Sequence, residues 1–214
     1  MKLYYHPLSS YSQKALLAFH EKGLPFAPQL VDVTSAEAKL AYQREVYPLG
    51  KVPLLEDEGL QLPESSLIAE WIDERYPSSG PRLVPTDRAL ALEVHQLDRF
   101  GDNYLNEPMQ KVLFDPMRPA DQRDPRGVGV ARSLLDRAYG CLETRLADGS
   151  TWLVGDAFTL ADVSAASPLF YLQRVHPYGA YPHLSAYAAR LLDRPAWKKV
   201  LAEAAPYLEA FAKG

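Results

Sequence analysis

Cysteine is almost absent from this sequence, which has only Cys141 among its 214 residues. A single cysteine cannot close an intramolecular disulfide, so no disulfide framework holds the fold. Cys141 falls among leucines and alanines at helical spacing, and we expect it to be a buried packing residue and not a reactive thiol. The five histidines are scattered without the spacing of metal ligands, so we expect no metal.

An excess of positive charge is also missing, because 23 Lys and Arg residues face 27 Asp and Glu residues. Without a basic cluster the electrostatic attraction that dominates nucleic-acid binding is lost, and we expect no nucleic-acid partner. No apolar run approaches the roughly 20 residues needed to span a bilayer. The first residues read directly as a strand and not as a signal peptide, so we expect no membrane association and a cytoplasmic location.

The first 77 residues alternate between strand-like and helix-like patterns. Prolines and glycines punctuate the pattern, and the turn around Gly59 joins two strands as a hairpin. The order βαβαββα predicts an α/β sandwich with a four-stranded mixed sheet. The expected elements are a strand at 3–5, a helix at 10–22, a strand at 26–33, a helix at 35–46, strands at 52–55 and 60–62, and a helix stopped by Pro77.

The remaining residues predict an all-helical domain. A Ser, Gly and Pro segment follows Pro77, and strand-like alternation disappears after it, so we expect domain 1–77, linker 78–85 and domain 86–214. The segment Asp115–Gly129 is rich in prolines, glycines and charges, which suggests a flexible rim or lid. Thr159 and Asp162 have the spacing of a capping box. Helical periodicity runs at about 86–107, 127–147, 159–174, 183–193 and 195–212.

Three local motifs lie in the first domain. Residues 4–12 read Tyr-Tyr-His-Pro-Leu-Ser-Ser-Tyr-Ser, residues 47–55 read Tyr-Pro-Leu-Gly-Lys-Val-Pro-Leu-Leu, and residues 63–72 read Pro-Glu-Ser-Ser-Leu-Ile-Ala-Glu-Trp-Ile. In order and spacing they resemble the glutathione S-transferase family, in a bacterial form whose serine-type loop is similar to the theta, delta and zeta classes, with some similarity to the beta class. The resemblance implies a thioredoxin-like domain that binds glutathione and an all-helical domain that binds the second substrate.

In this resemblance the first motif activates the thiol of glutathione. A free thiol has a pKa of about 8.5, so a hydroxyl donor and the positive end of a helix are needed to stabilise the thiolate. By alignment Ser9 is the first candidate. Ser10, which lines up with the beta-class cysteine, is the second, and Tyr5, which lines up with the tyrosine of other classes, is the third. The alternative for both serines is a helix N-cap.

The second motif implies the peptide-binding part of the site. In the family the bond between Val52 and Pro53 is cis, and the main chain of Val52 pairs with glutathione as with an added strand. Lys51 is placed to meet a glutathione carboxylate, although a solvated lysine before a strand is the alternative. Tyr47 stands where the family commonly has Asn, so the helix-capping role usual there is not carried over.

The third motif implies recognition of the γ-glutamyl end, which carries an ammonium and a carboxylate. Glu64 supplies an anion for the ammonium. The Ser65 hydroxyl and the N–H groups of the helix start supply donors for the carboxylate. The alternative is that both residues only favour the first turn of the helix by charge and capping.

We therefore predict a glutathione transferase that passes the sulfur of glutathione to a small hydrophobic electrophile in detoxification, and that forms a homodimer as the family does. A zeta-type isomerase is an alternative, although the loop lacks the cysteine and arginine of that class. A thiol-disulfide oxidoreductase ranks lower because the loop has no cysteine. A non-catalytic interaction module on the same fold is the other alternative. Candidate wall residues of the second-substrate pocket are Tyr104, Met109, Phe114 and Met117.

Overall fold

The computed structural model describes the backbone of residues 1–213 and the side chains of residues 1–210. Its contacts divide the chain into two compact units. Residues Met1–Leu83 and the last helix, α9 (Pro195–Lys213), form the first unit, and Val84–Arg194 form the second. We had expected α9 in the helical domain, yet it packs along the first helix. Periodicity reveals the apolar face of a helix, but it does not reveal which element covers that face.

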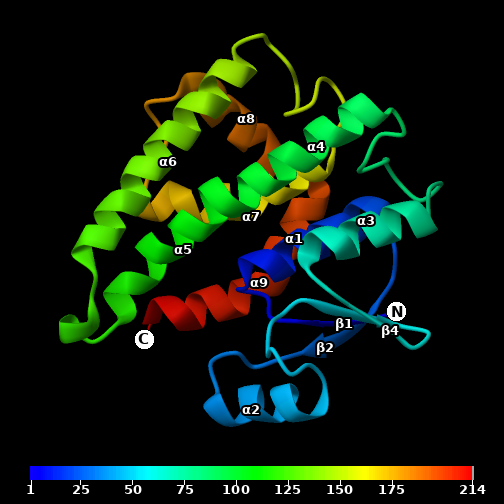
Figure 1. The fold of residues 1–214 in the computed structure, drawn as a ribbon, viewed down its shortest axis with the longest axis vertical. Coiled ribbons are helices and arrows are strands. Elements are labelled where there is room, and N and C mark those ends of the chain that lie inside the picture. Colours follow the sequence, from blue (N-terminus) through cyan, green and yellow to red (C-terminus); the bar gives the residue numbers. More distant parts are fainter. Residues whose placement is uncertain (214) are drawn as a thin grey trace. The chain divides into compact units, whose positions relative to one another are not determined.

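The first unit has the predicted βαβαββα order. The sheet has the order β2-β1-β3-β4, with β1 parallel to β2 and antiparallel to β3, and β3 forms a hairpin with β4. Figure 1 shows α1 and α3 over one face of this sheet and α2 over the other. The elements are β1 (Lys2–Tyr5), α1 (Ser10–Lys22), β2 (Ala27–Leu30), α2 (Ala36–Glu45), β3 (Leu54–Asp57), β4 (Leu60–Pro63) and α3 (Ser65–Arg75).

Local sequence explains where these elements begin and end. Ser9 caps α1, and Gly23 ends it with φ of 63°, a left-handed conformation that glycine adopts without steric cost. Pro28 has no N–H to donate, and it lies in β2, an edge strand whose four residues are all exposed. The core lies between the sheet and the pair α1 and α3, with Leu16, Phe19, Leu55, Ile68 and Ile72 fully buried.

The second unit is helical and is organised around α7, which packs against α4, η1, α5 and α8. The predicted capping box of Thr159 and Asp162 is confirmed at the start of α7. Burial raises the pKa of the Asp162 carboxyl, which also accepts the Tyr187 hydroxyl at 2.9 Å. The helices are α4 (Arg88–Phe100), the π-helix η1 (Gly101–Asn106), α5 (Glu107–Phe114), the 3-10 turns η2 (Asp115–Met117) and η3 (Ala120–Gln122), α6 (Pro125–Leu146), α7 (Leu160–Val175) and α8 (Pro182–Leu192).

The helix expected at about 86–107 continues through the π-helix into α5, which the sequence did not predict. Pro108 lies just after the π-helix and has no N–H for the helical ladder, and it stands where the pattern of main-chain hydrogen bonds changes. Gly101 begins the π-helix, and a Cβ there would lie 2.8 Å from the Cβ of Ser164. This close approach to α7 accounts for the glycine, and a π-helix accommodates the change of backbone path between α4 and α5.

The expected loop Asp115–Gly129 is largely structured. It contains η2 and η3, and α6 begins at Pro125 with Asp124 as its N-cap. The carboxylate of Asp124 lies 2.8 Å from Lys111 Nζ, and its main-chain N–H donates to Asp115 at 3.0 Å. These bonds tie the segment to α5.

The expectation that Cys141 is buried is wrong, because its side chain is exposed. The buried face of α6 runs through Leu135, Tyr139, Leu142 and Leu146. Cys141 lies about 100° around the helix from Leu142 and so points away from this face. Apolar neighbours in sequence were a poor guide, because helical phase and not proximity along the chain decides burial.

None of the helices in the described residues is long and apolar enough to cross a membrane.

Candidate functional site

The sheet topology brings the three predicted motifs to one end of the first unit. Tyr4 near the end of β1 lies opposite Leu54 at the start of β3, and Leu54 lies opposite Pro63 at the end of β4. The segments just outside these positions are the loop before α1, the Val52–Pro53 pair and Glu64. Strand register therefore assembles parts of the chain that are far apart in sequence.

Ser9 occupies the N-cap of α1. Its φ and ψ are −72° and 119°, and its Oγ accepts the N–H of Ser12 at 3.3 Å. Ser9 is therefore a helix N-cap, and this role uses its hydroxyl only as a hydrogen-bond acceptor. A hydroxyl is also one O–H donor, so Ser9 retains a hydrogen that can be directed at a ligand while it caps the helix. The side chain is partly exposed at the positive end of the helix dipole.

The other two thiol candidates are less accessible. Ser10 is only 8% exposed and is the first helical residue of α1. Tyr5 is buried, and its hydroxyl donates to Glu203 in α9 at 3.0 Å. Burial first, and then the negative charge of Glu203, raise the pKa of the Tyr5 hydroxyl. Its proton is held by a carboxylate, and of the three hydroxyl residues Ser9 is the only one that is not buried.

His6 fixes the loop between β1 and α1, a role that the sequence did not suggest. Its Nδ1 accepts the N–H of Leu8 at 3.2 Å, and its carbonyl accepts the N–H of Ser9 at 2.9 Å. Its own N–H donates to Ser12 Oγ at 3.4 Å. Burial lowers the pKa of His6, partly offset by the charge of Asp32, and so favours the neutral ring that can accept a hydrogen bond.

The second motif has the geometry that the resemblance implied. The bond between Val52 and Pro53 is cis. Lys51 is exposed, and its carbonyl accepts the hydroxyl of buried Tyr42 at 3.1 Å, which fixes the chain just before Val52. The main-chain N–H of Tyr47 donates to the Tyr42 carbonyl at 3.0 Å.

Glu64 has the backbone conformation of a strained residue. Its φ and ψ are 71° and 117°, which lie outside the regions that non-glycine residues ordinarily adopt. Such strain costs about 1–3 kcal/mol and persists where the surroundings enforce it, often at functional sites. Glu64 is exposed and makes no side-chain cap bond, while Ser65 beside it is 3% exposed at the first position of α3. The exposed carboxylate and the α3 N-terminus therefore stand together.

Lys14 is the residue that the motifs missed. It is 2% exposed, and its Nζ donates to Ser66 Oγ at 2.8 Å, joining α1 to the first turn of α3. A buried ammonium next to a helix N-terminus adds positive potential where an anion would bind. The signal in the sequence was a lysine one turn after Ser10 and directly before the apolar run Ala15–Phe19.

The candidate wall residues of the second unit divide into two groups. Tyr104, Phe114 and Met117 keep about half of their surface exposed, at 46%, 47% and 50%. Met109 is only 1% exposed and belongs to the core, so it cannot line an open pocket. Among the described residues, no group of three or more His, Cys, Asp or Glu side chains could hold a metal ion.

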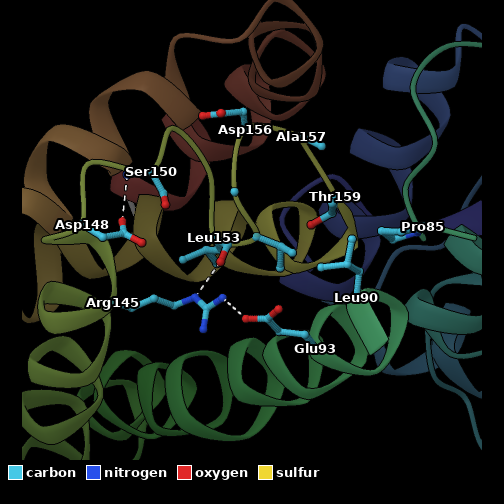
Figure 2. Close-up of a pocket in the computed structure, with 12 residues that line it drawn as sticks. Pro85, Leu90, Glu93, Arg145, Asp148, Ser150, Leu153, Asp156, Ala157 and Thr159 are labelled. Atoms are coloured by element: carbon cyan, nitrogen blue, oxygen red, sulfur yellow. Dashed lines mark hydrogen bonds and ion pairs between the residues drawn. The ribbon is translucent and has the colours of Figure 1, made fainter. Parts of the chain in front are cut away.

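A separate pocket of about 700 Å³ lies in the second unit, where none of the motif residues is found. Figure 2 shows Arg145 reaching across it from the end of α6. Its guanidinium donates to the Leu153 carbonyl at 2.6 Å and pairs with the Glu93 carboxylate of α4. Two guanidinium nitrogens of Arg145 therefore contact other residues of the protein. These contacts hold the loop before α7 in place.

Comparison with known proteins agrees with this geometry. The family model described as "Glutathione S-transferase, N-terminal domain" matches residues 3–82, and the one described as "Glutathione S-transferase, C-terminal domain" matches residues 69–190. A curated relative, glutathione S-transferase F7 of Arabidopsis thaliana, is 29% identical over 94% of this chain and 99% of its own.

Solved structures give the same assignment. The structure of glutathione S-transferase III in its apo form has a TM-score of 0.79 at 30% identity, over 94% of this chain and 95% of the other. A glutathione S-transferase from Methylobacillus flagellatus with glutathione bound has a TM-score of 0.82 at 25% identity, over 93% of this chain and 98% of the other. With both family models matched in order along the chain, the chain belongs to the glutathione S-transferase family.

Proposed function

We propose that this protein activates the thiol of glutathione as a thiolate at Ser9 and transfers the sulfur to a small hydrophobic electrophile. The observation that carries the proposal is the geometry of Ser9, whose Oγ accepts a main-chain N–H at the start of α1 and keeps its own hydrogen to donate. A hydroxyl donor combined with the helix dipole stabilises an anion on sulfur. The thiol of bound glutathione then loses its proton to water at neutral pH, and the thiolate forms a C–S bond with the electrophile as the leaving group departs with its bonding electrons.

The peptide backbone of glutathione would pair with Val52. The main-chain N–H and C=O of Val52 have no hydrogen-bond partner among the described residues, and the residue is only partly buried. An extended peptide laid against this segment satisfies both groups as an added strand would. Lys51 is exposed beside it, and its ammonium would neutralise a glutathione carboxylate.

The γ-glutamyl end would be bound at the start of α3. Its ammonium meets the exposed carboxylate of Glu64, and its carboxylate meets Ser65 and the N–H groups of the first turn. The buried ammonium of Lys14, which donates to Ser66, adds electrostatic attraction for the γ-glutamyl carboxylate. Within the serine-type classes that the loop resembles, we rank Ser9 first, Ser10 second and Tyr5 third as the thiol donor.

Binding to glutathione agarose, followed by calorimetry with Glu64→Ala, tests the binding half of the proposal. We expect wild type to be retained and eluted by free glutathione, and Glu64→Ala to bind about tenfold more weakly with kcat at saturation little changed, because Glu64 is remote from sulfur. Glu58→Ala is a matched control, since Glu58 is also an exposed acidic residue with positive φ but lies in the β3–β4 turn. Failure of wild type to bind glutathione would favour an interaction module on this fold.

We also propose a cytoplasmic homodimer that acts in detoxification. The apolar side chains of Leu90 and Leu92 on α4 are 45% and 70% exposed, and Leu67 on α3 is 44% exposed. Each of these side chains would lose contact with water if a second copy covered it, which is favourable for apolar surface. Light scattering at micromolar concentration should give twice the mass of one 23.9 kDa chain, and a monomeric mass would contradict the dimer.

A further inference from the structure

The C-terminal helix α9 packs against the loop that carries Ser9. His6, at the start of this loop, is 4% exposed, and the ring of Tyr207 in α9 lies against it with centroids 5.2 Å apart and planes at 70°. This edge-to-face contact is a favourable geometry for aromatic rings. The His6 ring therefore has α9 on one side and bonds to the loop on the other.

A second contact fixes the helix at the same place. Glu203, one turn before Tyr207, accepts the hydroxyl of Tyr5 at 3.0 Å through one carboxylate oxygen. Its other oxygen lies 3.0 Å from Nε2 of His20 in α1. Glu203 thus ties α9 both to the end of β1 and to α1, which are the elements that flank the Ser9 loop.

We propose that Tyr207 and Glu203 are positioning residues for the thiol-activating hydroxyl, and that Tyr207 acts on Ser9 through the ring of His6. The inference rests on the proposed function of Ser9. Residues almost 200 positions downstream would then set the orientation of the reactive loop, so the C-terminal helix belongs to the active-site apparatus.

The effect of Tyr207 on Ser9 passes through three steps. Tyr207 limits the rotation of the His6 ring, and a fixed ring keeps Nδ1 on the Leu8 N–H. That bond and the bond from Ser9 N–H to the His6 carbonyl set the path of the loop. A loop held in this path aims the Ser9 hydroxyl, and catalytic hydrogen bonds lose effect when they are misplaced by an ångström or less.

The test compares Tyr207→Ala with Tyr207→Phe by turnover with a general electrophile, 1-chloro-2,4-dinitrobenzene, and by thiolate absorbance of bound glutathione against pH. Tyr207→Ala should slow kcat about 3- to 10-fold and raise the thiol pKa of bound glutathione, with the KM for glutathione within about twofold. Tyr207→Phe keeps the ring and should behave as wild type. Lys199→Ala, an exposed change on the same helix, is the control for surface effects.

A double-mutant cycle with His6→Asn separates this path from a general loss of packing. Asparagine can accept the N–H two residues on, as His6 does, but it offers no ring to Tyr207. Tyr207→Ala should therefore cost nothing further in the His6→Asn background. An equal loss in both backgrounds, or a folded Tyr207→Ala variant with wild-type kcat and thiol pKa, would overturn the inference.

The same experiment distinguishes this inference from the proposed function. If wild type does not lower the thiol pKa of bound glutathione, the role of Ser9 fails and the inference fails with it. If wild type lowers that pKa and Ser9→Ala raises it while Tyr207→Ala does not, the inference alone is wrong. Glu203→Gln gives a second reading, because it should shift kcat and the thiol pKa in the same direction as Tyr207→Ala.

Discussion

Lys22 and Asp73 form a buried ion pair whose removal should cost a large share of the stability of the first unit. Their side chains are 0% and 1% exposed, and Lys22 Nζ lies 2.8 Å from Asp73 Oδ1. Lys22 also donates to the Pro81 carbonyl at 3.1 Å, so it joins the end of α1 to α3 and to the segment that follows α3. Lys22→Met keeps most of the length of the side chain and removes the ammonium.

The magnitude follows from what Asp73 retains. Breaking a buried pair by removing one partner typically costs about 3–5 kcal/mol, because a charge is left buried without compensation. Arg82, with 29% of its side chain exposed, still lies 3.4 Å from Asp73 Oδ2. This second cation reduces the penalty, so we expect a loss near the lower end, about 3 kcal/mol. For a chain of this size that corresponds to roughly 6–12 °C in Tm.

Urea denaturation followed by tryptophan fluorescence measures the loss, with Lys22→Met compared with wild type at the same m-value. The matched variant is Lys22→Met combined with Asp73→Asn, which removes both charges and keeps an acceptor for Arg82. It should recover at least 1 kcal/mol relative to Lys22→Met alone. A loss below about 1 kcal/mol for Lys22→Met, or no recovery in the double variant, would refute the electrostatic reasoning.

Two further predictions follow from buried polar groups near the proposed site. Lys14→Met should weaken glutathione binding about tenfold in calorimetry, because a buried cation bonded to Ser66 supports the anion site. Lys14→Arg should retain most of the affinity. Equal affinities for Lys14→Met and wild type would count against this role. His6 has its pKa lowered by burial, so as pH falls below about 6.5 the unfolded chain takes up a proton that the folded chain resists, and the free energy of unfolding falls. His6→Phe should flatten this pH dependence in urea titrations between pH 7 and 5, and an unchanged slope would show that other groups cause it.

Much of the first unit could be predicted because its signals are local. The bounds of α1 follow from the serine before it and Gly23 after it, and the β3–β4 hairpin lies between Pro53 and Pro63 with its turn at Gly59. The cis bond before Pro53 followed from the resemblance, as no local physical rule distinguishes it from a trans bond. The bounds of the helices and strands depend on a few neighbouring residues, so they can be predicted without knowledge of the tertiary structure.

Most features that the sequence missed depend on tertiary packing, as the place of α9 does, which is decided by the surface that receives it. The exposure of Cys141 is the exception, because the phase of its own helix decides it. Lys14 looks like an ordinary helical lysine until α3 is brought beside it. Tyr5 aligned with a catalytic tyrosine, but only the structure reveals that its hydroxyl belongs to Glu203. Long-range partners of polar side chains are the part that local patterns do not contain.

The thiol pKa of bound glutathione in wild type, Ser9→Ala and Ser10→Ala tests the central claim most directly, read from thiolate absorbance against pH. Ser9 supplies one donor to a diffuse sulfur anion and main-chain donors remain, so Ser9→Ala should slow turnover about 10- to 100-fold with little change in glutathione affinity. The thiol pKa should be well below about 8.5 in wild type and in Ser10→Ala, and should rise in Ser9→Ala. A thiol pKa that stays low in Ser9→Ala and rises in Ser10→Ala would contradict the account and identify Ser10 as the residue that stabilises the thiolate.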